Sequence, residues 1–402
     1  MEEALSIWVY NKNMLNISLS DEILLSKAQV LGEKLKIEDF GYSQGWLNNF
    51  KKRFNIKLRK LCGESKEVDE FYVQEERRKL QKDLEGVDQE NIFNFDETAL
   101  FYQAQPTRTF SSVPMNGTKI SKQRVTIGLC CNFTGTYKCT PVLINKSKKP
   151  KSFKYGFNPN MYVEYYYNKK AWMTQELFTK FIQKLDNEMK KQKRKIILLL
   201  DNSRTHMIKY VPSNITIKFF GPNLTSHLQP LDSGIIMNFK LKYRKLLMEY
   251  YLHQMDNKDK FEKLELINIK DAIRFIRTAW NQVSVSTINN CFNHVQILKK
   301  SSNTILNELS NTISSELSNT ISSELSNTIK QNKELEELDS LIRNFGEKLV
   351  FDPIINSEEY INCDSKEDTT PQLTDDDIIQ MVQNHAEDNN AEEEKNEEKK
   401  NE

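Results

Sequence analysis

The chain has 402 residues, of which 38% are hydrophobic and 10% aromatic, so it can bury a sizeable core and is not wholly disordered. Its net charge of +1 hides an asymmetry: residues 331–402 carry 7 Lys and Arg against 22 Asp and Glu, a net charge of −15, whereas residues 1–330 carry +16. A basic body followed by an acidic tail predicts a polyanionic partner, although a lysine-rich solvated surface explains the same charge.

Two classes of protein are excluded by simple patterns. No apolar run is long enough to span a bilayer, and the N-terminus lacks the basic and apolar segments of a signal peptide, so we expect no membrane partner. The six cysteines form no C-x-x-C pair and have no metal-ligand spacing with histidine. This pattern predicts reduced thiols in an intracellular protein.

Residues 1–64 are predicted to form a domain of three helices, in which Ser20 and Ser43 are suitable N-caps for the second and third. The third helix and the segment after it carry polar and basic side chains outside the apolar stripe: Gln44, Asn48, Asn49, Lys51, Lys52, Arg53, Lys57, Arg59 and Lys60. A short three-helix domain with a basic last helix is typical of helix-turn-helix DNA readers. A small helical domain with solvated lysines remains an equal alternative.

A family resemblance begins at this helix. Residues 40–53, Phe-Gly-Tyr-Ser-Gln-Gly-Trp-Leu-Asn-Asn-Phe-Lys-Lys-Arg, followed by Gly63-Glu64, resemble the second helix-turn-helix of the centromere protein B and Tigger/pogo transposase family. The resemblance implies that the nine polar and basic residues contact double-stranded DNA. A further helix-turn-helix normally precedes this one in the family, and the sequence begins after its expected position.

The middle of the chain alternates strand and helix patterns. Residues 65–90 are charged and amphipathic, which predicts a helical linker. The patterns beyond predict strands over 92–95, 107–111, 124–133, 137–144, 196–200 and 215–220, a helix over 174–191, and helices from 235 to 297. We therefore expect a mixed α/β domain with a central sheet over 91–297.

Three acids stand at the ends of such elements. Asp96 follows a short apolar run, Asp201 follows the five apolar residues 196–200, and Asp232 precedes a helical pattern. Carboxylate oxygens are hard ligands for Mg²⁺ or Mn²⁺, and two such ions can activate water and stabilise a leaving oxygen in phosphodiester cleavage. Taken singly, each Asp is better explained as a turn or cap residue.

The resemblance continues through these acids. Asn94-Phe95-Asp96-Glu97-Thr98, Leu199-Leu200-Asp201-Asn202 with His206, and Gln229-Pro230-Leu231-Asp232-Ser233-Gly234 match the three motif blocks of the Tigger/pogo nuclease domain, and Ala279-Trp280, 287–291 and 358–361 match further blocks. It implies a ribonuclease-H-like DDE-superfamily endonuclease fold in which Asp96, Asp201 and Asp232 are catalytic metal ligands for Mg²⁺ or Mn²⁺. It also implies DNA hydrolysis followed by attack of the freed 3′-hydroxyl on a target phosphodiester.

Residues around these acids have open roles. Glu97 and Asn202 are candidates to support the ligands, and His206 is compatible with orienting a phosphate or water, or with a structural hydrogen bond. Two lysine-rich stretches, 146–154 and 190–195, are expected to hold the DNA backbone.

The C-terminal part carries no predicted chemistry. Residues 298–332 contain an octapeptide repeat of poor helix formers, which predicts a low-complexity insertion. Residues 333–402 are predicted to contain a helix over 333–350 and a disordered acidic tail that includes Asp375–Asp377 and Glu387–Glu402.

The sequence as a whole predicts an α+β multidomain protein of the nucleus, related to Tigger/pogo transposable elements. It has an N-terminal helix-turn-helix domain, a mixed α/β ribonuclease-H-like nuclease domain, a helical C-terminal part and an acidic tail. Two functions stay open: a transposase-type nuclease, and a domesticated DNA-binding protein without nuclease activity. The oligomeric state is also open, a homodimer included.

Overall fold

A computed structural model describes residues 1–14, 19–54, 56, 70–106, 123–154, 156–221, 224–257, 265–299, 316–348, 355–370, 375–376 and 378–379. The chain divides into two compact units, which we call the helical unit (1–68 with 372–402) and the sheet unit (69–371). The predicted strand over 107–111, the basic residues Lys57, Arg59 and Lys60, and the acidic stretch Glu387–Glu402 lie outside the described residues.

The helical unit contains the three expected helices, α1 (Glu2–Met14), α2 (Asp21–Lys34) and α3 (Gln44–Arg53). Both predicted N-caps are confirmed, because Ser20 Oγ accepts a hydrogen bond from Ile23 N at 3.3 Å and Ser43 Oγ accepts one from Trp46 N at 3.2 Å. The helices share one core, to which Leu5, Trp8, Leu24, Leu31, Leu47 and Phe50 contribute.

A glycine sets the spacing between α2 and the chain before α3. A Cβ added at Gly32 would lie 1.7 Å from the Tyr42 hydroxyl oxygen, so only glycine lets the tyrosine ring approach the helix. Tyr42 in turn packs edge-to-face against Phe40 and Trp46.

The helical unit also includes a short piece of the C-terminal tail. Ile378 and Ile379 are buried in the core of α1–α3, at 1% and 9% exposure. Asp375 forms an ion pair with Lys27 at 2.5 Å, and Asp376 forms one with Lys34 at 2.6 Å. We expected these two acids to be disordered with the rest of the tail, but the pair of isoleucines after them brings them onto α2.

The sheet unit is built on a six-stranded sheet in the order β4-β3-β2-β1-β5-β6. Its strands are β1 (Ile92–Phe101), β2 (Arg124–Asn132), β3 (Val142–Asn145), β4 (Glu164–Tyr167), β5 (Ile196–Leu200) and β6 (Ile215–Phe219). β1, β2 and β3 pair antiparallel, whereas β5 and β6 continue the sheet parallel to β1. Three antiparallel strands followed by parallel ones form the mixed α/β core of a ribonuclease-H-like fold, as predicted.

Three strands differ from the prediction. β1 is longer than 92–95, because β2 pairs with it from Phe93 to Phe101 and both of its faces are covered. The predicted strand over 137–144 is reduced to a single bridge at Lys138 and the short β3. β4 was not predicted, because its sequence Glu-Tyr-Tyr-Tyr is too short for an alternating pattern to show.

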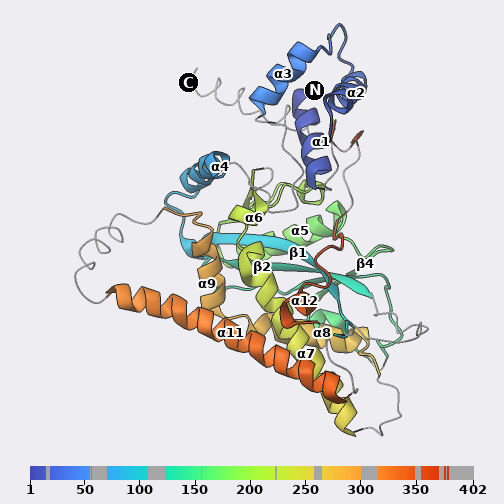
Figure 1. The fold of residues 1–402 in the computed structure, drawn as a ribbon, viewed down its shortest axis with the longest axis vertical. Helices are drawn as coiled ribbons and strands as arrows, with labels where there is room; N and C mark the ends of the chain where they lie inside the picture. Colours follow the sequence, from blue (N-terminus) through green and yellow to red (C-terminus); the bar gives the residue numbers. More distant parts are fainter. Residues whose placement is uncertain are drawn as a thin grey trace. The chain divides into compact units, whose positions relative to one another are not determined.

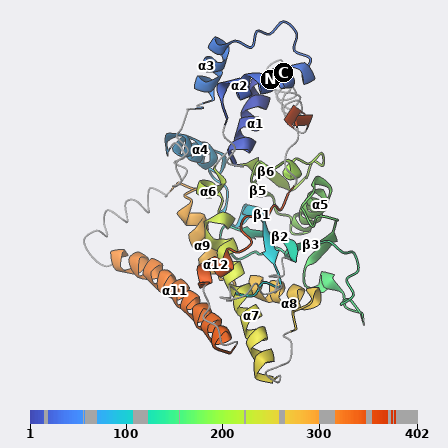
Figure 2. The ribbon, with the colours of Figure 1, turned by 45° about the vertical axis from the view of Figure 1, so that its right-hand side comes forward.

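Helices cover both faces of the sheet (Figures 1 and 2). One face packs against α5 (Gln175–Lys191), whose Phe178, Phe181 and Ile182 meet Phe93 and Phe95 of β1. The other face carries α7 (Ile236–Asn257), α8 (Ile269–Gln282) and α9 (Val285–His294). α4 (Glu70–Asp83) belongs to the same unit, since Arg77 Nε donates to the Val295 carbonyl at 3.3 Å.

The C-terminal helices also pack on the sheet unit. α11 (Glu316–Lys348) begins inside the octapeptide repeat, for which we predicted a low-complexity insertion of poor helix formers, and contains most of the predicted helix over 333–350. Its last part lies along α7 through Leu338, Ile342 and Phe345 and through the ion pairs Lys242–Glu334 and Lys245–Glu337. Tertiary packing of this kind stabilises helices whose own propensity is low. None of the helices in the described ranges is long and apolar enough to cross a membrane.

Candidate active site and DNA-binding surface

The three predicted acids come from three elements that meet at one end of the sheet. Asp96 lies in the middle of β1, Asp201 directly follows β5, and Asp232 lies in the π-helical turn η4 (Leu231–Ile235) that leads into α7. β1 and β5 are parallel, with Asn94 opposite Leu199, so Asp96 and Asp201 lie at the same level of neighbouring strands. The structure therefore brings together the three carboxylates that stand far apart in the sequence.

Asn94 fixes the third element relative to the other two. Its amide nitrogen donates to the Leu199 carbonyl of β5 at 2.9 Å, and its amide oxygen accepts from Leu231 N at the start of η4 at 3.0 Å. Asn94 is fully buried, so loss of either bond would leave a polar group without a partner in the core. Asn94 belongs to one of the motif blocks, but the sequence alone indicates no role for it.

Asp96 and Asp232 are in direct contact. Burial, followed by the charges of Asp232 and Asp201, raises the pKa of Asp96 well above its usual value. Asp232 opens to solvent on one side, yet the dense protein around it and the Asp201 charge raise its pKa as well, against a hydrogen bond from Asp96 that lowers it. A positive charge beside Asp96 and Asp232 would lower both pKa values, because it would favour the ionised carboxylates.

The neighbour of the Asp201 carboxylate is the side chain of His206. His206, which is completely buried, lies with Nδ1 2.5 Å from Asp201 Oδ1 and with Nε2 3.1 Å from Glu97 Oε1. Burial opposes protonation of the imidazole, but Glu97 and Asp201 outweigh it and raise the pKa of His206 well above its usual value. His206 thus lies between two carboxylates, and these contacts agree with the structural hydrogen bond that was one of its two predicted roles.

A glycine shapes the turn that carries Asp232. Gly234 has a φ of +146°, a conformation that L side chains rarely adopt, at the junction between η4 and α7. Gln229 Nε2 donates to Asp232 Oδ2 at 3.2 Å, while Gln229 Oε1 is buried without a hydrogen-bond partner. A buried oxygen without a partner, beside two carboxylates with raised pKa values, is a set of groups that a bound cation would stabilise.

The residues present fit a divalent metal ion. All the donors are hard oxygen atoms, as Mg²⁺ and Mn²⁺ require, and the Asp96–Asp232 pair would gain from a positive charge. The ligands are not yet arranged around a metal ion: within the described residues, no three His, Cys, Asp or Glu side chains lie in positions that would enclose one. The Asp201 carboxylate contacts His206 in this arrangement.

The predicted DNA-contacting residues fall into two groups on α3. Gln44 and Lys51 both reach Asp21 of α2, at 2.6 Å and 2.8 Å, and Arg53 binds Glu2. Asn48, Asn49 and Lys52 are exposed on the same helix and are not held by a carboxylate of the described residues. The structure thus leaves the second group directly accessible to a DNA duplex.

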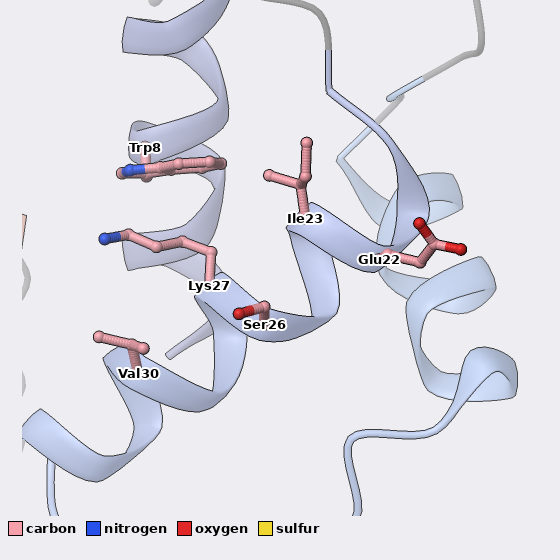
Figure 3. Close-up of a pocket in the computed structure, with 6 residues that line it drawn as sticks. All are labelled: Trp8, Glu22, Ile23, Ser26, Lys27 and Val30. Carbon is pink, nitrogen blue, oxygen red and sulfur yellow. The ribbon is translucent and has the colours of Figure 1, made fainter.

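A shallow hollow of about 360 Å³ lies between α1 and α2 (Figure 3). The Lys27 ammonium lies over the Trp8 ring at 5.2 Å, and Ile23 and Val30 leave 43% and 38% of their surface exposed beside it. Lys27 is also the partner of Asp375, so the C-terminal piece contacts α2 next to this hollow.

Models of two known protein families match this chain, one in each unit. Residues 1–60 match the model of the Tc5 transposase DNA-binding domain, and residues 122–292 match the model of the DDE superfamily endonuclease. The second match includes Asp201 and Asp232, whereas Asp96 lies before it.

Two curated relatives are similar over most of the chain. Tigger transposable element-derived protein 4 of Mus musculus is 30% identical over 294 residues, which cover 72% of this chain and 56% of that protein. CENP-B homolog protein 2 of Schizosaccharomyces pombe is 32% identical over 264 residues, covering 62% and 50%. The chain spans about half the length of these relatives. Among solved structures, the Mos1 mariner paired end complex with Mn matches with a TM-score of 0.34 at 12% identity, over 69% of this chain and 72% of that chain.

Proposed function

Because the chain belongs to the Tigger/pogo group of transposase-derived DNA-binding proteins, we propose that it acts in the nucleus on double-stranded DNA and that its sheet unit cleaves that DNA with divalent metal ions. The observation that carries this proposal is the meeting of Asp96, Asp201 and Asp232 at one end of the sheet, with Asp96 and Asp232 in contact. A surplus of negative charge in a partly buried site suits metal binding better than any structural role.

The roles of the residues follow from their contacts. Asp96, Asp201 and Asp232 would hold Mg²⁺ or Mn²⁺, which supplies activation of water and stabilisation of the leaving oxygen when bound. His206 keeps the Asp201 carboxylate in place at the end of β5, and Glu97 holds His206 from the other side. Asn94 keeps η4, and with it Asp232, against β1.

DNA would be held by both units. On α3, Asn48 and Asn49 can reach base edges and Lys52 a phosphate, in the manner of a helix-turn-helix reader. On the sheet unit, the lysines of 146–154 follow β3 at the end of the sheet where Asp201 follows β5, whereas 190–195 precede β5 at the opposite end. We therefore assign backbone contacts near the site to the first stretch. A homodimer remains one assembly compatible with this function.

The test is nicking of labelled duplex DNA by the full chain in Mg²⁺ or Mn²⁺, with a metal-free control. Asp201→Asn removes a ligand charge, and Asp368→Asn serves as the matched control, because Asp368 is an exposed acid of the same unit outside the site. Metal-dependent nicking that is lost in Asp201→Asn and kept in Asp368→Asn would support the proposal. Equal duplex binding with no nicking by any of the proteins would refute the nuclease.

A second candidate is a domesticated DNA-binding protein without nuclease activity. One observation favours it: the Asp201 carboxylate is engaged by His206, and the described residues hold no preformed three-ligand cluster. The same experiment separates the two, because this alternative predicts duplex binding that is independent of Asp201 and of metal.

A further inference from the structure

The segment between β3 and β4, whose lysines we assigned to backbone contacts, also forms a hollow. The hollow has a volume of about 590 Å³, and its rim carries Lys148, Lys149, Lys151 and Lys154. No Asp or Glu occurs between Asn145 and Val163. Lysines elsewhere on the unit, such as Lys180 and Lys184, pair with carboxylates, but within the described ranges none of the four rim lysines does. Four unpaired cations around one hollow attract a polyanion.

The floor of the hollow is aromatic. Phe153, Phe157, Tyr165 and Tyr167 line it, and Tyr167 is 44% exposed with the Lys148 ammonium 5.6 Å from its ring centre. Two cations of α8 lie over Phe157, with Lys270 at 5.5 Å and Arg274 at 5.8 Å from its ring centre. Exposed rings beside cations bind the flat faces of nucleic-acid bases, because every base stacks on an aromatic ring while its phosphate meets a lysine.

The pairing of the strands places this hollow relative to the acids. Thr98 of β1 pairs with Ile127 of β2, Ile127 with Leu143 of β3, and Leu143 with Tyr165 of β4. Side chains paired across a sheet share a face, and residues two apart on a strand share it too, so Tyr165 and Tyr167 lie on the same face as Asp96. β4 is three strands from β1, about 14 Å at the usual spacing of neighbouring strands. Tyr165 is level with Thr98, so the hollow is separated from Asp96 by three strands and also by two residues along β1.

We propose that this hollow binds an unpaired DNA strand, with Tyr167 stacking on a base and Lys148 and Lys149 contacting its phosphates. A closed duplex presents phosphates but hides its base faces, so it would use the lysines and leave the rings idle. An acidic peptide would do the same. The inference rests on the proposed function in one respect, the source of the unpaired strand. Cleavage near the acids would release that strand as a DNA end.

The test measures binding of the full chain to a labelled 12-nucleotide oligo-dT and to a mixed-sequence duplex, by fluorescence anisotropy over a range of salt. Tyr167→Ala should weaken binding of oligo-dT about tenfold and change duplex binding less than twofold, and Tyr167→Phe should restore it. Replacing Lys148 and Lys149 together by Gln should reduce the salt dependence for oligo-dT by about 1.4 in log–log slope. The control is Lys190→Gln with Lys191→Gln, which removes the same charge at the other end of the sheet.

Three outcomes would overturn the proposal. One is a change of less than twofold for Tyr167→Ala on oligo-dT, and another is an equal loss in the Lys190/Lys191 control. The third is competition by oligo-glutamate as strong as by oligo-dT of equal charge. Nicking of duplex by the same preparations is scored separately. Loss of nicking with intact oligo-dT binding would therefore count against the nuclease and not against the hollow.

Discussion

Removal of Asp364 should destabilise the sheet unit more than any other single change of an acid outside the site. Asp364 is 1% exposed and accepts from Arg244 Nη2 at 2.6 Å, from Lys240 and from Phe101 N at 2.9 Å. Asp364→Ala leaves two buried cations without their counter-charge, which costs about 4 kcal/mol. For a unit of this size, each kcal/mol lowers the melting temperature by roughly 2–4 °C, so we expect a drop of about 10 °C.

Differential scanning calorimetry of the full chain would measure this drop. Asp368→Ala is the control, because this acid lies four residues later, is exposed and should cost less than about 0.5 kcal/mol. A triple variant with Lys240→Met, Arg244→Met and Asp364→Leu should recover most of the stability, since it removes all the buried charges together. A cost below about 1 kcal/mol for Asp364→Ala would refute the reasoning that the two cations depend on it. Because Phe101 ends the strand that carries Asp96, nicking should fall along with stability.

Three further changes test other parts of the molecule. Burial alone would raise the pKa of Asp186, but hydrogen bonds from Tyr210, Ser213 and Asn214 outweigh it and lower that pKa. The ionised Asp186 therefore stabilises the fold fully above the pKa of an unfolded Asp, and this stabilisation is lost as the pH falls through the lower pKa of the folded state. In Asp186→Asn, the unfolding free energy measured by urea titration should fall less steeply below about pH 4 than in the unchanged protein. Gly234→Ala should cost about 2 kcal/mol of unfolding free energy because of its positive φ, and should reduce nicking more than DNA binding; equal stability would contradict this. Lys52→Ala should lower the salt slope of duplex binding by about 0.9, whereas Lys51→Ala should lower it less, because Lys51 already pairs with Asp21; equal slopes would count against α3 as the reader.

Much of the fold could be read from local patterns. The N-caps Ser20 and Ser43 and the apolar run 196–200 act through neighbours in the sequence, so the helices and the central strand were predictable. The length of β1 was not, because residues 96–101 belong to a strand only through their pairing with β2. The start of α11 in the repeat was missed because Ser, Asn and Thr are poor helix formers, whereas the last part of this helix packs on α7.

The candidate site shows the same division. The three acids could be named from their motif blocks, but the contact between Asp96 and Asp232, and the engagement of Asp201 by His206, depend on how β1, β5 and η4 meet. Asn94 has no sequence signal beyond being polar within an apolar run, and only its two buried hydrogen bonds reveal what it does. The pairing of Gln44 and Lys51 with Asp21 was equally hidden, because it joins residues of two helices.

The burial of Ile378 and Ile379 among α1–α3 makes the helical unit discontinuous in sequence. The whole sheet unit is inserted between its two parts. During synthesis, the first three helices leave the ribosome long before the residues that complete their core. The helical unit therefore reaches its final form only after Ile378 and Ile379 have been made, and a fragment that stops at residue 68 would expose apolar surface that these residues cover.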